Sequence, residues 1–288
     1  MAERVEAQGM GASPEFTTAV DVERRGAVLL LTLNGPSSRN AIGPSVYPQI
    51  QAQIISAASD PFIRVVVLSG AGGFFSSGGN VRALQDSAKG TLADATINTD
   101  KLNAMVKAIL ESSVPVIAAV EGGAAGAAVS AVLACDMIVA SRNARFTVAH
   151  VRVGLSPDGG VTHFLRSSLP RQMVMQACLL GEPLSAEKLA AAGIVNVLAS
   201  DGDALREALA LAEKIASGPP QAIGNIKQLV NAAAESDIAT HLDREARAIN
   251  LARFGQEAAE GLSAFLAKRR PDFGQAQRNG EMQEKVDP

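Results

Sequence analysis

Short apolar runs alternate with segments of helical periodicity through the first two thirds of the chain, and this alternation predicts the fold. The apolar runs typical of strands are residues 28–33, 64–69, 116–120, 137–140 and 145–149. Such runs are expected where both faces of a sheet are covered. Helical spacing or small-residue content predicts helices at 47–58, 98–110 and 122–134. The order of elements predicts an α/β fold with right-handed crossovers.

The pattern changes past about Pro170, where nearly every segment has the period of a helix. The predicted helices are 171–180, 185–192, 203–217, 220–234 and 238–253, with one short strand at 194–198. We therefore expect a core over residues 19–200 and a C-terminal helical region over residues 201–288. Residues 1–18 contain no apolar run, so they do not resemble a secretory signal and are expected to form a disordered leader.

Composition excludes several classes of function. The net charge of −3 over 288 residues gives no general attraction to nucleic acid or to an anionic membrane. No stretch approaches the roughly 20 apolar residues that a membrane span requires. The two cysteines, Cys135 and Cys178, are expected to be small core residues of a reducing compartment, so we expect a cytoplasmic protein. Three histidines give no spacing suited to a metal cluster.

Two of the apolar runs end in glycine-rich turns, at residues 76–80 and 122–127. Neither turn has the spacing of a dinucleotide fingerprint, a P-loop or a nucleophile elbow. Small residues at the end of a buried strand can instead bring bare backbone N–H groups close to a ligand. One donor from each turn would form a site for the negative oxygen of an enolate. The alternative is that both turns are only tight corners.

Five ordered motifs show a resemblance to a known family. The motifs are FSSGGNV at 75–81, VPVIAAVEG at 114–122, ACDMIVA at 134–140, GLSPDGG at 154–160 and EGLSAFLAKRRPDF at 260–273. In this order and spacing they resemble the enoyl-CoA hydratase/isomerase, or crotonase, family. The resemblance implies a spiral of β-β-α units with a helical C-terminal region. It also implies an acyl-CoA thioester substrate, no separate cofactor because CoA is part of the substrate, and a homotrimer or homohexamer.

The resemblance also implies roles for particular residues. The two oxyanion-hole amides fall on Gly79 and Ala127. The CoA-binding positions fall on Arg39, Asn40, Ala41, Ser77, Gly79 and Lys268. The alternative for Lys268 and the two arginines after it is a solvated helix end that complements the helix dipole.

The acid and base positions depart from the hydratase pattern. Hydratases of the family use two glutamates, and these positions fall on Ser130 and His150, neither of which is a carboxylate. Asp158 lies where some double-bond-shifting members carry their catalytic acid. One carboxylate is enough for isomerisation, because it can take a proton from C2 and return it at C4. The sequence therefore favours an enoyl-CoA isomerase that uses Asp158.

Alternatives remain open for each of these positions. Asp158 could cap the helix that starts at Gly159 or Gly160. His150 could be a catalytic base or a wall residue, and the Ser130 hydroxyl could bond back to the preceding turn of its helix. For the whole chain, the alternatives are an enoyl-CoA hydratase and a non-catalytic acyl-CoA-binding paralogue. The acyl group is left open between fatty acyl chains and intermediates of aromatic-ring degradation.

Overall fold

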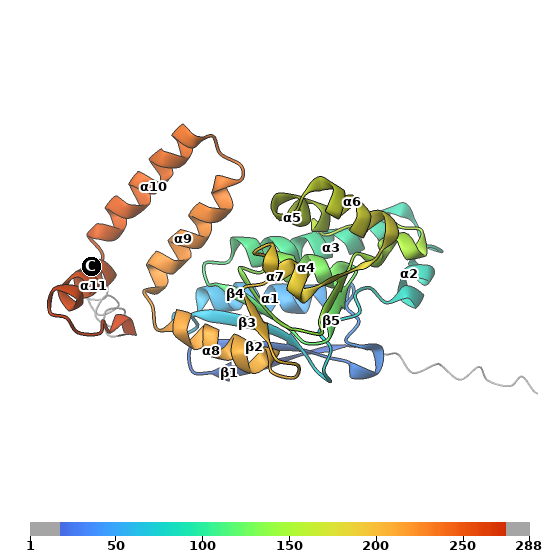
Figure 1. The fold of residues 1–288 in the computed structure, drawn as a ribbon, viewed down its shortest axis with the longest axis horizontal. Coiled ribbons are helices and arrows are strands. Elements are labelled where there is room, and N and C mark those ends of the chain that lie inside the picture. Colours follow the sequence, from blue (N-terminus) through green and yellow to red (C-terminus); the bar gives the residue numbers. More distant parts are fainter. Residues whose placement is uncertain (1–17, 275–288) are drawn as a thin grey trace, which may run out of the picture.

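A six-stranded sheet forms the centre of the computed structural model, which describes residues 18–274 (Figure 1). Its strands run in the order β1-β2-β3-β4-β6-β9, and all neighbours are parallel except β1 and β2. Their bounds are β1 Ala19–Arg25, β2 Val28–Asn34, β3 Val65–Gly70, β4 Val116–Val120, β6 Met137–Ser141 and β9 Val197–Ala199. A second, three-stranded sheet contains β5 Gly123–Ala125, β7 Arg145–Thr147 and β8 Pro183–Ser185.

Helices cover both faces of the six-stranded sheet, which explains the continuous apolar runs. One face packs against α1 Tyr47–Ser59, α3 Leu92–Glu111 and α4 Ala127–Ala134. The other face packs against α8 Ala204–Ala216, whose buried residues are alanines. Alternate residues of a strand pack on opposite faces of the sheet. In β3, Val66 and Leu68 belong to the hydrophobic cluster on the first face, and Val65 and Val67 belong to the cluster on the second face.

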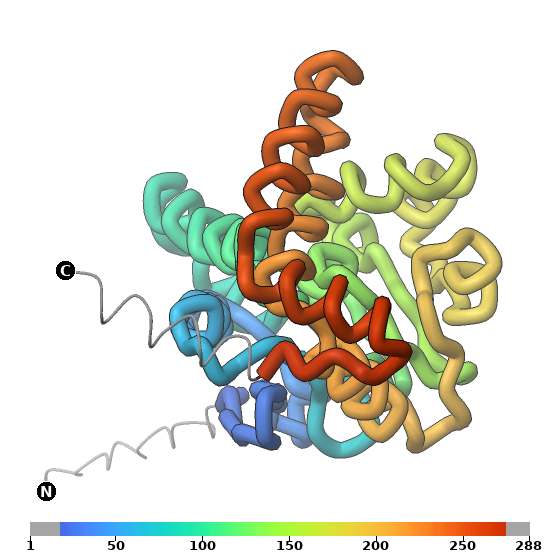
Figure 2. Tube along the Cα trace, turned by 90° about the vertical axis from the view of Figure 1, so that its left-hand side faces the viewer, coloured from blue at the N-terminus to red at the C-terminus, as the bar shows by residue number. Residues whose placement is uncertain are grey.

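The remaining helices lie in two groups. Around the ends of the strands are η1 Pro36–Ser38, α2 Val81–Ser87, η2 Ala149–Val153, α5 Val161–Ser168, α6 Arg171–Leu180 and α7 Ala186–Ala191. The C-terminal group is α9 Pro220–Ala233, α10 Ile238–Arg253 and α11 Gln256–Leu266. The hairpin of α9 and α10 stands away from the sheet, and Figure 2 looks onto the same group in orange and red.

Several elements differ from the sequence prediction. The helix expected over 122–134 is divided, because Gly123 to Ala125 pair as a strand and helix α4 begins only at Ala127. The strand β1 was missed because its side chains are mostly exposed and charged. Helix α3 starts six residues before the expected position, at Leu92 rather than residue 98, where Thr91 and Asp94 form a capping box. The expected leader lies, apart from Thr18, outside the described residues.

A buried ion pair fastens α9 to the sheet. Nζ of Lys227 lies 2.8 Å from Oδ2 of Asp136, and the lysine side chain is 4% exposed. The same ammonium donates to the carbonyl oxygens of Ile109 (2.7 Å) and Val114 (3.3 Å). The Asp136 carboxylate also accepts the N–H of Val116 at 2.7 Å. Burial raises the pKa of Asp136, and the positive charge of Lys227 opposes that rise.

Lys227→Met is expected to lower the free energy of unfolding at pH 7 by about 3–5 kcal/mol, because it leaves the Asp136 carboxylate buried without its cation. The pKa of Asp136 should rise further in this variant, so the buried group becomes neutral as the pH falls. The stability gap from the wild type should therefore narrow towards pH 4. Urea denaturation at pH 7 and at pH 4 measures this gap in the free energy of unfolding. A double variant that adds Asp136→Leu should recover most of the loss, and a gap that widens at low pH would contradict the account.

Candidate active site

The two glycine-rich turns meet at one edge of the sheet. Strands β3 and β4 are parallel neighbours, so their carboxyl ends lie side by side. Beyond those ends, Ser76 forms a parallel bridge with Ala124. The N–H of Ala125 donates to the Ser76 carbonyl at 3.0 Å, and the N–H of Ser76 donates to the Gly123 carbonyl at 3.3 Å. The segment that leads to Gly79 is therefore held against the segment that leads to Ala127.

Glycine is required at two points of this junction. Gly78 has a φ of +80°, and a Cβ there would overlap the carbonyl oxygen of Ala125. Gly126 has a φ of +53°, and a Cβ there would lie 3.9 Å from the amide nitrogen of Gly79. The Gly79 amide is thus close to the residue that directly precedes Ala127. A larger side chain at Gly78 would separate the two turns, whereas Gly126 is required by its positive φ.

The amides of Gly79 and Ala127 are both free to bind a ligand. Within residues 18–274, neither donates a hydrogen bond to another protein group. Ala127 is the first residue of α4, with Gly126 as its N-cap, so its N–H belongs to the unsatisfied N-terminal donors of a helix. The dipole of α4 favours negative charge at this end. The structure therefore brings together two donors suited to an oxyanion, and their catalytic role stays a prediction.

The structure pairs Asp158 with His150, which sequence reasoning treated separately. Nε2 of His150 lies 3.1 Å from Oδ1 of Asp158, and the two side chains are 10% and 39% exposed. Nδ1 of His150 is buried and has no partner among the described residues. A buried N–H without an acceptor is costlier than a lone pair without a donor, so we assign the neutral tautomer with its proton on Nε2. In this tautomer, His150 donates its hydrogen bond to the carboxylate.

The capping interpretation of Asp158 was wrong. Helix α5 begins at Val161, its N-cap is Gly160, and no side chain caps it. The prediction that the Ser130 hydroxyl bonds back within its helix was also wrong, since Oγ of Ser130 donates to the backbone carbonyl of Asp158 at 2.9 Å. Ser130 lies one turn after Ala127 in α4. One short helix therefore carries a predicted oxyanion donor and also holds the segment that bears the carboxylate.

Tyr47 is a further polar group at this site that sequence reasoning missed. It is the first residue of α1 and is only 6% exposed. Burial raises the pKa of its phenol, and the negative charge of Asp158 raises it further. The available signal was its identity, since it is the single tyrosine of the chain. Its position within a helical pattern made it appear to be an ordinary core residue.

Three of the predicted CoA-binding positions, Arg39, Asn40 and Ala41, are consecutive in one loop. Their side chains make different contacts. Arg39 is exposed, and its guanidinium lies 5.6 Å from the centre of the Phe74 ring. Asn40 is completely buried, accepts the N–H of Gly35 at 2.9 Å and donates to the carbonyls of Ala71 and Phe74. Its side chain therefore holds the loop and has no donor left for a ligand. The backbone N–H groups of Arg39, Asn40 and Ala41 are also bonded within the loop, so CoA binding by these residues stays a prediction.

Ser77 and Lys268 complete the predicted CoA positions. The Ser77 hydroxyl donates to the Ser38 carbonyl at 3.0 Å, and its N–H donates to the Arg39 carbonyl at 2.8 Å, so it belongs to the same loop. Lys268 instead follows α11, which lies at the opposite end of the molecule from α2 (Figure 1). Within one chain the structure does not bring Lys268 to the other predicted site residues.

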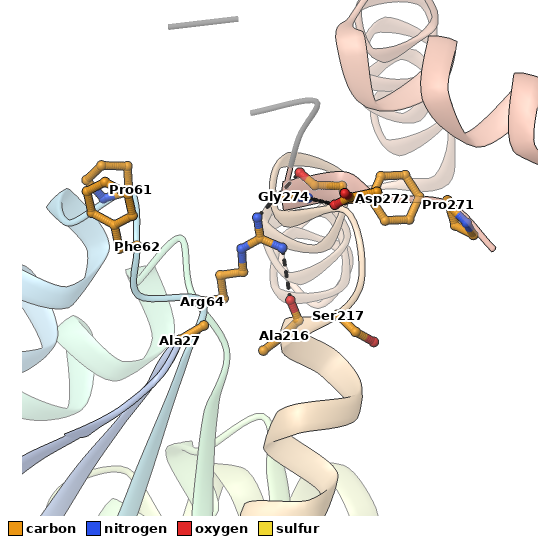
Figure 3. A pocket seen from close by; sticks show the side chains of 10 residues that line it. Ala27, Pro61, Phe62, Arg64, Ala216, Ser217, Pro271, Asp272 and Gly274 are labelled. Carbon is orange, nitrogen blue, oxygen red and sulfur yellow. Dashed lines mark hydrogen bonds between the residues drawn. The ribbon is translucent and has the colours of Figure 1, made fainter. Parts of the chain in front are cut away.

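A cavity of about 420 Å³ lies at the other end of β3, near the start of that strand (Figure 3). Arg64 points into it and donates to the carbonyls of Ala216 (3.0 Å) and Phe273 (3.4 Å). None of the predicted site residues lines this cavity. Because the Arg64 guanidinium is already bound to backbone carbonyls, we place the active site at the glycine turns instead.

Among the described residues, no group of three or more His, Cys, Asp or Glu is arranged to hold a metal ion. Also within this part of the chain, no helix is long and apolar enough to cross a membrane.

Comparisons with known proteins find similar sequences and a similar fold. The model of the enoyl-CoA hydratase/isomerase family matches residues 23–277. A 2,3-dehydroadipyl-CoA hydratase of Escherichia coli is 36% identical over 88% of this chain and 97% of its own length. A 1,2-epoxyphenylacetyl-CoA isomerase of the same organism is 34% identical, over 85% and 94%. The crystal structure of an enoyl-CoA hydratase from Polaromonas sp. JS666 has a TM-score of 0.86 at 39% identity, covering 88% of this chain and 98% of that one.

Proposed function

Because this chain belongs to the enoyl-CoA hydratase/isomerase family, we propose that it shifts the double bond of an enoyl-CoA thioester. The thioester oxygen of a 3-enoyl substrate would accept hydrogen bonds from the N–H groups of Gly79 and Ala127. Asp158 would take a proton from C2, which leaves a dienolate whose negative oxygen rests on those two donors. The same carboxylic acid would then return the proton at C4 to give the conjugated 2-enoyl thioester.

The observation that carries this proposal is the link between Asp158 and helix α4. The Ser130 hydroxyl holds the backbone of Asp158 at 2.9 Å, one helical turn from the donor of Ala127. A base that acts on C2 must lie near the group that holds the thioester oxygen, because C2 is bonded to the thioester carbon. In this chain the family's two glutamate positions hold Ser130 and His150, neither of which is a carboxylate. We therefore propose that Asp158 transfers the proton.

His150 has a supporting role in this mechanism. Its Nε2–H bond to Oδ1 fixes the rotation of the carboxylate and leaves Oδ2 for the substrate. A carboxylate that is held in one orientation loses less entropy when it reaches the transition state. We therefore propose that His150 orients Asp158 during isomerisation.

The same pair of side chains supports a second candidate, the hydration of a 2-enoyl thioester. Adding water across a double bond needs one group to activate water and one to protonate C2. His150 and Asp158, 3.1 Å apart, could divide these two tasks. One of the similar proteins is a hydratase by name and another is an isomerase, so relatedness favours neither activity.

One assay separates the candidates. The protein is incubated with a 2-enoyl and with a 3-enoyl thioester while the absorbance of the conjugated enoyl group is followed. Isomerisation should produce a gain of absorbance from the 3-enoyl substrate, whereas hydration should produce a loss from the 2-enoyl substrate. If neither substrate changes while both bind, the chain is an acyl-CoA-binding paralogue without this chemistry, and the proposal fails.

We also propose that the protein is a homotrimer or homohexamer of the cytoplasm, and the C-terminal helices support the assembly. Large apolar side chains on this group are exposed in the single chain: Val230, Ile238, Leu251, Phe254, Phe265 and Leu266, each between 67% and 90%. Exposed apolar area of this kind marks an interaction surface. Sedimentation equilibrium should give about 89 or 178 kDa, three or six times the 29.7 kDa of one chain. A monomer at micromolar concentration would contradict this assembly.

A further inference from the structure

Gly79 is a glycine that the fold of the protein alone does not require. The other glycines of the two turns and of the segment after Asp158 have a positive φ, which favours glycine: Gly78, Gly122, Gly123, Gly126, Gly159 and Gly160. The φ of Gly79 lies outside this region. A Cβ there would meet only Cδ1 of Leu84, at 3.4 Å, which is contact without overlap. Room for one methyl group is therefore left beside the half-buried Gly79.

The walls of this room are apolar and held in place. Asn80 is the N-cap of α2, and its side chain accepts two backbone N–H groups of that helix. The N–H of Leu84 donates to the Asn80 carbonyl at 3.0 Å. Because helical side chains point back toward the N-terminus, the first turn of α2 brings the Leu84 side chain over Gly79. On the other side of the turn, Ile42 forms a bridge with Gly79 and donates its N–H to the Gly78 carbonyl at 2.9 Å.

The position of the room relative to the substrate follows from the donor itself. This inference rests on the proposed function, in which the N–H of Gly79 binds the thioester oxygen. The Cα of Gly79 is bonded to that donor nitrogen, so a group on this Cα lies beside the thioester carbon. Besides the oxygen, the thioester carbon is bonded to sulfur and to C2. The sulfur is the same in every CoA thioester, whereas the groups on C2 differ from one substrate to another.

We propose that Gly79 determines specificity at C2, and that the substrates are enoyl thioesters with a methyl branch on this carbon. A methyl group in the room is buried against Leu84, which is favourable for an apolar group. A 2-methyl-3-enoyl thioester still has one hydrogen on C2 for Asp158 to remove, so the branch is compatible with the double-bond shift. Because the room lies on one side of the thioester, it accepts one configuration at C2.

Binding of saturated thioesters tests the inference without any turnover. Hexanoyl-CoA, each enantiomer of 2-methylhexanoyl-CoA and 3-methylhexanoyl-CoA are titrated calorimetrically into the wild type and Gly79→Ala. The wild type should bind one 2-methyl enantiomer about fourfold more tightly than hexanoyl-CoA, the gain expected from burying one carbon. Weaker binding of both enantiomers than of hexanoyl-CoA would overturn the inference.

The alanine of Gly79→Ala occupies the room that the branch needs. In this variant the ratio of the 2-methyl to the hexanoyl affinity should fall at least about tenfold, because two methyl groups compete for one space. The 3-methyl thioester is the control, and its ratio to hexanoyl-CoA should stay within about twofold of the wild-type ratio. An equal loss for all the thioesters would place the room beside the sulfur of CoA and overturn the inference. Unchanged ratios would overturn it as well.

Leu84→Ala changes the same room in the opposite direction. Leu84 is 44% exposed, and alanine suits a helix, so this variant should fold even where Gly79→Ala does not. Removing the leucine wall should raise the affinity for 2-ethylhexanoyl-CoA relative to 2-methylhexanoyl-CoA at least about threefold. A ratio equal to that of the wild type would overturn the inference. Failure of the enoyl absorbance assay with these binding results intact would count against the isomerase proposal alone.

Discussion

Asp158→Asn is expected to abolish double-bond migration, with a loss in kcat of about 10³-fold on a 3-enoyl thioester. The amide has nearly the shape of the carboxylate, but it cannot accept the proton from C2. Residues that hold CoA and the thioester oxygen are not changed, so the affinity for a saturated acyl-CoA should stay within a few-fold. The conjugated enoyl absorbance gives kcat, and calorimetric titration gives the affinity. Turnover near the wild-type rate would remove Asp158 from the proposed role.

His150→Gln is the matched variant for this experiment. A glutamine N–H can still donate to the Asp158 carboxylate, whereas an amide cannot accept a proton from water or substrate. If His150 only orients Asp158, the variant should keep isomerase activity within about tenfold of the wild type. If His150→Gln instead lost as much activity as Asp158→Asn when both variants are assayed with a 2-enoyl substrate, the result would favour the hydration candidate.

The central sheet could be predicted from the sequence because its signal is local. Strands β3 and β4 are mainly apolar, since each is covered by helices on both faces, and such runs are visible without any knowledge of the partners. Strand β1 could not be found in this way. It lies at the sheet edge, pairs only with β2, and most of its side chains are exposed. Its own composition does not indicate a strand, because the strand forms by hydrogen bonding to β2.

The same distinction holds at the site. Glycine at 78 and 126 is required by backbone geometry, and each of these residues directly precedes one of the two donors, so the sequence motif marks both donors. The start of α4 could not be predicted, because β5 forms only by pairing with a strand some twenty residues away. The pairing of His150 with Asp158 depends on how the segment between them folds. Neither residue type nor spacing predicts this pairing.

Ala127→Pro is expected to lower kcat/KM for the 3-enoyl thioester by about 10²–10³-fold, because it removes one of the two oxyanion donors. Proline is well tolerated at the first position of a helix, where its missing N–H has no partner in the helix and its fixed φ suits the backbone. Residue 127 of α4 is this first position, so the fold should be kept. The same enoyl absorbance assay measures the loss, and the thermal midpoint should change by only a few degrees.

Ala127→Gly is the control, since it also alters the side chain but keeps the N–H, and it should lose no more than a few-fold in kcat/KM. Free CoA, which has no thioester oxygen, should bind the proline variant with nearly the affinity of the wild type. Because the donor acts on the negative oxygen of a dienolate in isomerisation and of an enolate in hydration, its loss should appear with either activity. If the proline variant turned over as fast as the glycine variant, the oxyanion would have to be held elsewhere, and the site built from the two glycine turns would be wrong.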